Sequence, residues 1–260
     1  PAIMAISLAA LRVMEKEMGF RLNATASCVA GHSLGEYSAL TAAGSFSLSD
    51  CAKLLQIRGR AMQAAVPEAI DFSQETETTS KLYGIDQEAT KTAGQRLLAA
   101  RRLIERGVRF VQVFPSPYGV WDSHQKLKDN HTRLCGTIDQ PITGLIQDLK
   151  QRGMLDDTLV IWGGEFGRMP MSEKGVGRDH NPWGYTTVLF GAGVKHGHVH
   201  GATDDFGLRA TEDKVHIHDL HATMLHILGI NHKQFTYPFR GLDTKLTGVE
   251  GGKVIEGILG

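Results

Sequence analysis

The chain has 260 residues, and its 28 Lys and Arg balance 28 Asp and Glu, so the formal net charge at pH 7 is zero. This neutral balance gives no electrostatic footprint for nucleic acid, and no apolar run is long enough to span a bilayer. Three widely spaced cysteines indicate neither a disulfide framework nor a zinc knuckle. The histidines are uneven: of the 12, only His32 lies before residue 120.

The first elements alternate between helix and strand. Residues 2–18 carry a broad apolar helical face, and residues 25–30 (TASCVA) are small and partly β-branched, which is typical of a short buried strand. The segment EYSALTAA, which ends before Gly44, predicts a helix, and Ser47 indicates the start of another helix over 49–65. This part of the chain therefore predicts a strand, a turn and helices.

The sequence changes character near residue 67, where a polar stretch follows. Strands that alternate with helices predict an α/β fold with a mostly parallel sheet flanked by helices. We expect two segments, residues 1–68 and 69–260, with no Gly/Ser-rich linker between them. The later elements predicted from periodicity are helices at 85–106, 137–152 and 218–228 and strands at 109–114, 158–162 and 186–190.

Residues 31–35 (GHSLG) have the G-x-S-x-G spacing of a nucleophile elbow. In such an elbow, glycines on both sides allow a sharp strand-to-helix turn that exposes the serine hydroxyl. The backbone N–H of the next residue then faces a developing oxyanion. The spacing predicts Ser33 as the nucleophile and the N–H of Leu34 as an oxyanion donor. The alternative is a glycine-rich connection that contains an incidental serine.

The run GHSLGEYSAL, with TASCVA before it and LLQIRGRAMQAAVPE after it, resembles malonyl-CoA:acyl-carrier-protein transacylases. The resemblance covers residues 1 to about 68 and implies that Ser33 accepts the acyl group, with malonyl-CoA and acyl carrier protein as partners. It also implies that Arg58 pairs with the malonyl carboxylate, although a solvated helix arginine is the alternative. The family's oxyanion loop and its later general-base histidine have no counterpart in this sequence.

A second group of candidate residues follows residue 120. Asp122 and His124 are two residues apart, so an extended backbone would turn both side chains to the same side, as a metal pair requires. Glu165 lies between glycines after the predicted strand 158–162, and the segment RDHNP (residues 178–182), which contains Asp179 and His180, adds further candidate ligands. Together these residues predict a site for a divalent metal such as Zn, Mn or Ca.

From about Asp71 to Gly260 the chain resembles the C-terminal part of the domain-of-unknown-function 1501 family, which is related to sulfatases and alkaline phosphatases. The segments ARRLIERGVRFVQVF, WDSH, LKQRGMLDDTLVIWGGEFGRMP, GRDHNPWGYTTVLFGAG and VHIHDLHATMLHILGI carry this resemblance. It implies a phosphatase/sulfatase-like fold and a metal site, made by Asp122, His124, Glu165 and His180, that acts on a phosphate or sulfate ester. The superfamily's first aspartate ligand and its nucleophile should lie upstream, where the acyltransferase-like piece stands.

Several other polar residues have structural explanations that we favour over metal binding. His196, His198 and His200 predict an exposed loop, His216, His218 and His221 a helix start, and Asp204-Asp205 a turn. Trp162 and Trp183 predict core or pocket-wall positions.

Three functions therefore compete: a serine acyltransferase, a metal-dependent ester hydrolase, and a composite of two incomplete enzyme domains. We favour the composite for the whole chain, because each resemblance lacks part of its active site. Pro1 lies inside an apolar helical pattern with no basic segment before it, so no signal peptide is visible and cytoplasm is the default, although relatives of the second segment are often exported.

Overall fold

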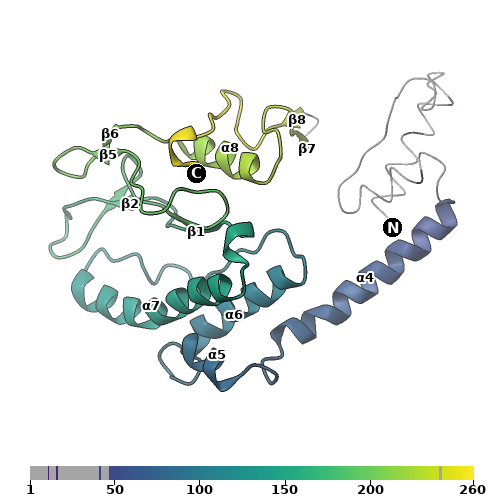
Figure 1. Cartoon of the computed structure of the whole chain (residues 1–260). Coiled ribbons are helices and arrows are strands. Elements are labelled where there is room, and N and C mark those ends of the chain that lie inside the picture. The colour runs from purple at the N-terminus through teal and green to yellow at the C-terminus, as the bar shows by residue number, and fades with distance from the viewer. Residues whose placement is uncertain (1–10, 12–15, 17–40, 42–46, 240–241) are drawn as a thin grey trace. The chain divides into compact units, whose positions relative to one another are not determined.

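The computed structural model describes residues 47–239 and 242–260 together with residues 11, 16 and 41, and of residues 58–67, 238 and 239 it describes the backbone only. The chain divides into two compact units, Pro1–Gln74 and Glu75–Gly260 (Figure 1). The helix predicted over 2–18, the strand over 25–30 and the helix after the serine turn lie almost wholly outside the described residues.

The first unit contains helix α4 (Leu48–Ile70). Ser47 is its N-cap, because the Ser47 hydroxyl oxygen accepts a hydrogen bond from the backbone N–H of Asp50 at 3.1 Å. This cap and the helix predicted over 49–65 are confirmed, and the helix continues five residues further, to Ile70.

The second unit begins with a layer of three helices, α5 (Glu77–Leu82), α6 (Lys91–Glu105) and α7 (Leu127–Gln151). Helix α7 starts ten residues before the predicted start at 137 and holds Pro141 in its interior. An interior proline removes one hydrogen bond and costs about 3 kcal/mol. Burial of one continuous face, formed by Leu134, Ile138, Pro141, Leu145 and Leu149, offsets that cost.

Two glycines allow these helices to approach the end of α5. A Cβ atom on Gly94 of α6 would overlap the carbonyl oxygen of Tyr83, and one on Gly144 of α7 would overlap that of Leu82. The end of α5 therefore packs against both longer helices, and α6 and α7 pack against each other (Figure 1).

A buried ion network joins the three helices. Asp148 lies at its centre, with its carboxylate 2.9 Å from Nε of Arg101 and 2.7 Å from Nε of Arg152. The hydroxyl of Tyr83 donates a hydrogen bond to Asp148 at 2.9 Å, and Arg101 also pairs with Glu75 at 2.9 Å. Burial, followed by the negative charge of Asp148, raises the pKa of Tyr83 well above its ordinary value of 10.0.

Every strand in the described part of the second unit belongs to a two-stranded antiparallel pair. The four pairs are β1 (Val160–Trp162) with β4 (Val188–Phe190), β2 (Gly167–Arg168) with β3 (His180–Asn181), β5 (Ala202–Thr203) with β6 (Ala210–Glu212), and β7 (Tyr237–Phe239) with β8 (Leu242–Thr244). In Figure 1 β1 lies between the α6–α7 layer and helix α8 (Ile217–Ile227), and β2 lies to the side, near β5 and β6.

The predicted mixed α/β class is confirmed, but the predicted parallel pairing and phosphatase-like sheet are not seen in the described residues. A parallel pair needs a crossover connection, usually a helix. The connection between β1 and β4 contains the short β2–β3 pair and no helix, so β4 returns antiparallel to β1.

The strand predicted over 109–114 is not formed. This segment lies along α6, where Nη1 of Arg96 donates a hydrogen bond to the carbonyl oxygen of Phe114 at 2.7 Å. Residues 110–114 do alternate between exposed and partly buried side chains, with Phe110 and Phe114 exposed. No described strand pairs with this segment. Alternation alone could not predict a partner strand.

The rest of the unit consists of α8 and two short 3₁₀ helices, η1 (Leu155–Asp157) and η2 (Glu256–Ile258). The predicted helix over 218–228 corresponds to α8. None of the described helices combines the length and apolar character that crossing a membrane requires.

Candidate metal centre

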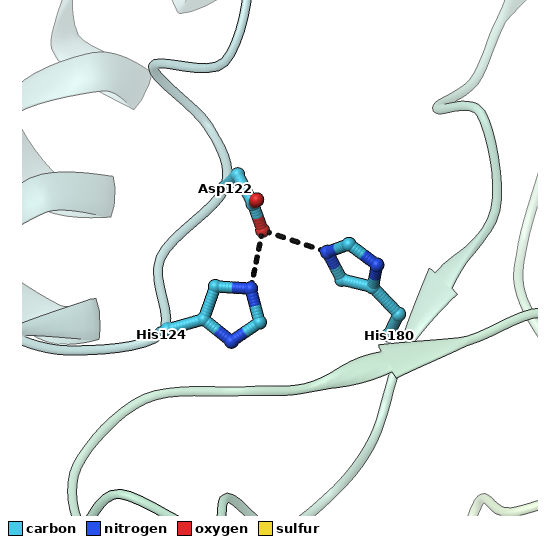
Figure 2. A group of neighbouring side chains, drawn as sticks. All are labelled: Asp122, His124 and His180. Carbon is cyan, nitrogen blue, oxygen red and sulfur yellow. Dashed lines mark hydrogen bonds and ion pairs between the residues drawn. The ribbon is translucent and has the colours of Figure 1, made fainter.

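Three of the four predicted ligands lie together in the second unit (Figure 2). Asp122 and His124 come from the loop between α6 and α7, and His180 comes from β3. Oδ1 of Asp122 lies 3.2 Å from Nε2 of His124 and 3.0 Å from Nε2 of His180. One ligand atom from each residue lies within 4.8 Å of the others, which is the arrangement that could hold one cation. We call these three residues the metal cluster.

His124 has a carboxylate partner on its other ring nitrogen. Its Nδ1 lies 3.0 Å from Oδ1 of Asp179, while Oδ2 of Asp179 accepts a hydrogen bond from the backbone N–H of Glu173 at 2.8 Å. The Glu173 N–H, followed by the hydrogen bond with His124, lowers the pKa of Asp179 below its ordinary value. An ionised Asp179 accepts a hydrogen bond from Nδ1–H of His124. This tautomer leaves the lone pair on Nε2 of His124, the ring nitrogen on the side of Asp122.

Backbone contacts bring the two parts of the metal cluster together. The N–H of Arg178 donates to the carbonyl oxygen of Ser123 at 2.9 Å, and the N–H of Leu127 donates to that of Val176 at 3.2 Å. A Cβ atom on Gly177 would overlap the carbonyl of His124, so only glycine permits this approach. The buried Ser123 is held in turn by Asn130, whose Nδ2 donates to the Ser123 hydroxyl at 2.6 Å.

Arg168 of β2 also contacts the metal cluster. Its Nη1 lies 2.5 Å from Oδ1 of Asp122 and its Nη2 lies 2.6 Å from Oε1 of Glu165. The guanidinium lies over the ring of Phe166, 5.5 Å from the ring centroid. The centroids of the Phe166 and His180 rings are 4.8 Å apart. The hydrogen bond with His180, followed by the contacts with Arg168, lowers the pKa of Asp122.

Glu165, the fourth predicted ligand, does not join the metal cluster. Its side chain is 61% exposed and reaches Asp122 only through Arg168. Arg168 was missed from the sequence, although it lies three residues after Glu165. Asp179 was among the candidate ligands of the segment RDHNP, but it contacts Nδ1 of His124 and is not part of the metal cluster. Ligand spacing singles out metal-binding residue types and passes over an arginine, and nothing in RDHNP says whether its one carboxylate binds a metal or supports another ligand.

The other predicted site residues belong to the first unit. Ser33 and Leu34 lie outside the described residues. Arg58 belongs to α4, but only its backbone is described. Their predicted roles therefore stay predictions.

The structural explanations for the remaining polar residues fit the described residues. His216 caps α8: its Nδ1 accepts a hydrogen bond from the N–H of His218 at 3.2 Å, and Asp219 completes a capping box. Residues 196–199 form an exposed loop. The Asp204 carboxylate closes a turn by accepting from the backbone N–H groups of Phe206, Leu208 and Arg209.

The described part of the chain is thus a mixed α/β protein with one cluster suited to a divalent cation. The chain belongs to the family described as "Protein of unknown function (DUF1501)", whose sequence profile matches residues 18–259. This match begins well before the predicted boundary at residue 68. No solved structure matches the chain significantly.

Curated relatives match only a fragment of the chain. The malonyl CoA-acyl carrier protein transacylase of Haemophilus influenzae is 40% identical over 89 residues, which are 34% of this chain and 26% of that protein. That of Escherichia coli K12 is 44% identical over 68 residues, 26% of this chain and 21% of the relative. The polyketide biosynthesis protein ThaF of Burkholderia thailandensis is 65% identical over 37 residues, 14% of this chain and 3% of that protein. The chain thus spans about a quarter, or less, of these relatives.

Proposed function

We propose that the second unit binds a divalent cation at Asp122, His124 and His180 and carries the metal-binding part of a phosphate or sulfate ester hydrolase. The observation that carries this proposal is the convergence of three ligand atoms, with Asp179 on the far nitrogen of His124. A carboxylate behind a ligating histidine fixes its tautomer and raises its basicity, and Asp179 stands in that position relative to His124.

The donor set favours some cations over others. Two imidazole nitrogens with one carboxylate oxygen suit Zn²⁺, and Mn²⁺ to a lesser degree, whereas Ca²⁺ prefers oxygen ligands throughout. Three protein ligands leave coordination positions open, as in catalytic zinc sites. We therefore propose Zn²⁺ or Mn²⁺ in preference to Ca²⁺.

A cation at this position would act as a Lewis acid on an ester oxygen. The residues of the chain would supply binding and orientation. Arg168 has five N–H donors and uses two nitrogens on Asp122 and Glu165, so donors remain for the anionic oxygens of the ester. Phe166 and Glu165 hold the guanidinium in place. We assign no nucleophile, because no described residue at the metal cluster is suited to that role.

The test is metal content together with turnover. After dialysis with Zn²⁺ or Mn²⁺, the full chain should retain about one equivalent by elemental analysis, and the double variant H124A/H180A should retain none. If the chain is a composite of two incomplete domains, the metal-loaded protein should not hydrolyse p-nitrophenyl phosphate or p-nitrophenyl sulfate. A wild-type chain that retains no metal would overturn the metal site, and turnover that the double variant lacks would overturn the composite.

A second candidate function rests on the transacylase fragment. Residues 31–40 (GHSLGEYSAL) lie in a chain that is 40% identical over 89 residues to a malonyl CoA-acyl carrier protein transacylase. We propose Ser33 as the acceptor of a malonyl group from malonyl-CoA, with the N–H of Leu34 as oxyanion donor, Arg58 as the carboxylate partner and acyl carrier protein as the second substrate. Intact mass after incubation with malonyl-CoA should show one added malonyl group, and the S33A variant should show none. An unmodified wild-type chain would exclude this function.

A further inference from the structure

Trp183 is an exposed tryptophan close to the metal cluster. Its side chain is 68% exposed, so a core position is wrong for this residue. It lies three residues after His180, and because consecutive Cα atoms are 3.8 Å apart, the two Cα atoms are within about 11 Å of each other. The indole is therefore within reach of an organic molecule whose ester group lies at the metal cluster.

The backbone that carries Trp183 is firmly held. Asn181, which is 1% exposed, accepts a hydrogen bond from the N–H of Trp183 at 3.1 Å and donates to the carbonyl oxygen of Leu208 at 3.0 Å. The carbonyl oxygen of Trp183 accepts from the N–H of Ala210 at 2.8 Å. The residues around Trp183 are thus tied to the β5–β6 connection, and the exposure of the indole is a fixed feature of this surface.

Arg209 comes from that connection and lies beside the indole. Its guanidinium carbon is 5.9 Å from the centroid of the Trp183 ring, within the range of a cation–π contact. Arg209 is exposed, and in the described part of the chain it forms no ion pair. An exposed aromatic ring beside a cation without a carboxylate partner contributes little to folding stability, but it suits a ligand that carries a ring and a negative charge.

We propose that Trp183 and Arg209, which we call the aromatic platform, bind the organic part of the substrate. The flat apolar face of an aryl or sugar ring would stack on the indole, and a negative group on that ring would pair with Arg209. The inference rests on the proposed function only in assigning the ester group to the metal cluster. It sets the substrate class as ring-bearing esters and excludes small ring-free phosphates and sulfates as preferred substrates.

The test measures binding to the full chain loaded with Zn²⁺, by calorimetry, with two phosphonates, whose P–C bond an ester hydrolase does not cleave, and two phosphate esters, whose stability during the titration is checked by phosphate release. Phenylphosphonate and methylphosphonate differ by the aryl ring, and glucose 6-phosphate and methyl phosphate differ by the sugar. Trp183→Ala should weaken binding of phenylphosphonate or glucose 6-phosphate by about tenfold and leave both ring-free probes within about twofold. The probe that responds identifies the ring as aryl or sugar.

Arg209→Gln should weaken binding of 4-phosphonobenzoate, which carries a second negative group, more than it weakens binding of phenylphosphonate. The matched controls are Phe235→Ala, another exposed aromatic residue, and Lys233→Gln, another exposed cation. The aromatic platform is overturned if wild type shows no preference for either ring probe, or if Trp183→Ala behaves like Phe235→Ala.

His180→Ala separates this inference from the proposed function. It should weaken all probes alike, because it removes the anchor for their phosphorus oxygens, and it should preserve the preference for a ring. A ring preference in a chain whose probe affinities do not respond to His180→Ala would overturn the metal cluster as the ester site and leave the aromatic platform standing.

Discussion

Nδ1 of His124 lies 3.0 Å from Oδ1 of Asp179, a residue 55 positions further along the chain. Asp179 immediately precedes His180, so one short segment supplies both a candidate ligand and the carboxylate that orients another. Asp179 directly precedes β3, and His180 is its first residue. A backbone hydrogen bond from the N–H of Met169 to the carbonyl oxygen of Asp179 holds this segment beside the end of β2. The metal cluster and its support are therefore one structural unit.

The variant Asp179→Asn tests that support. An amide keeps the size of the side chain but loses the charge that favours the Nδ1–H tautomer of His124, so we expect Zn²⁺ affinity to fall by roughly 10-fold to 100-fold. Competition titration against a zinc-binding dye measures the change. Asp205→Asn, at an exposed aspartate, is the control and should bind as wild type does. Equal affinities for the two variants would remove Asp179 from the site.

Glu165→Gln distinguishes the ligand set predicted from the sequence from the one in the structure. Because Glu165 reaches the metal cluster only through Arg168, its neutralisation should change Zn²⁺ affinity by less than about threefold, whereas removal of a true ligand costs much more. The same dye titration serves, with His180→Ala as the comparison. A loss as large as that of His180→Ala would make Glu165 a ligand that moves when the cation binds.

Local patterns predicted the parts of this protein that depend on neighbours in sequence. The Ser47 cap, the turn at Asp204 and the helix start at His216 each need only a side chain that reaches backbone two to five residues away. The Asp122–His124 pair is equally local. Arg168 could not be predicted, because its importance comes from a contact with Asp122 that is 46 residues away in sequence.

The sheet shows the opposite case. Residues 158–162 and 186–190 were predicted as strands, and β1 and β4 lie within them. Their direction depends on the chain between them, where the glycine-rich segment after Trp162 folds into the β2–β3 pair. Hydrophobic content identifies a strand, but the length and shape of its connection decide whether its partner is parallel.

Asp148→Asn should destabilise the helical layer strongly. The Asp148 side chain is 6% exposed and compensates both Arg101 and Arg152, so the variant removes the carboxylate that the two guanidinium groups share and leaves the buried Arg101 with Glu75 and Glu105 alone. Removing one partner of a buried ion pair costs about 3–5 kcal/mol, whereas an exposed pair is worth about 1 kcal/mol or less. Urea unfolding measures the difference. Glu77→Gln, which breaks the exposed pair with Lys81, is the control, and similar losses in the two variants would contradict the role given to burial.

Tyr83 should make the protein less stable in alkaline solution. Its pKa is raised in the folded state by burial and by Asp148, so between the ordinary tyrosine pKa near 10 and the folded value only the unfolded chain has lost the proton. Unfolding then releases a proton, and this contribution to stability is complete below about pH 10 and declines above it, by up to about 1.4 kcal/mol per pH unit. Urea unfolding at pH 8 to 11 should show this decline in wild type and a shallower one in Tyr83→Phe, whose ring cannot ionise. Tyr118→Phe, at a fully exposed tyrosine, should retain the wild-type slope. If Tyr83→Phe and Tyr118→Phe have the same slope, Tyr83 ionises in the folded protein and is not held by Asp148.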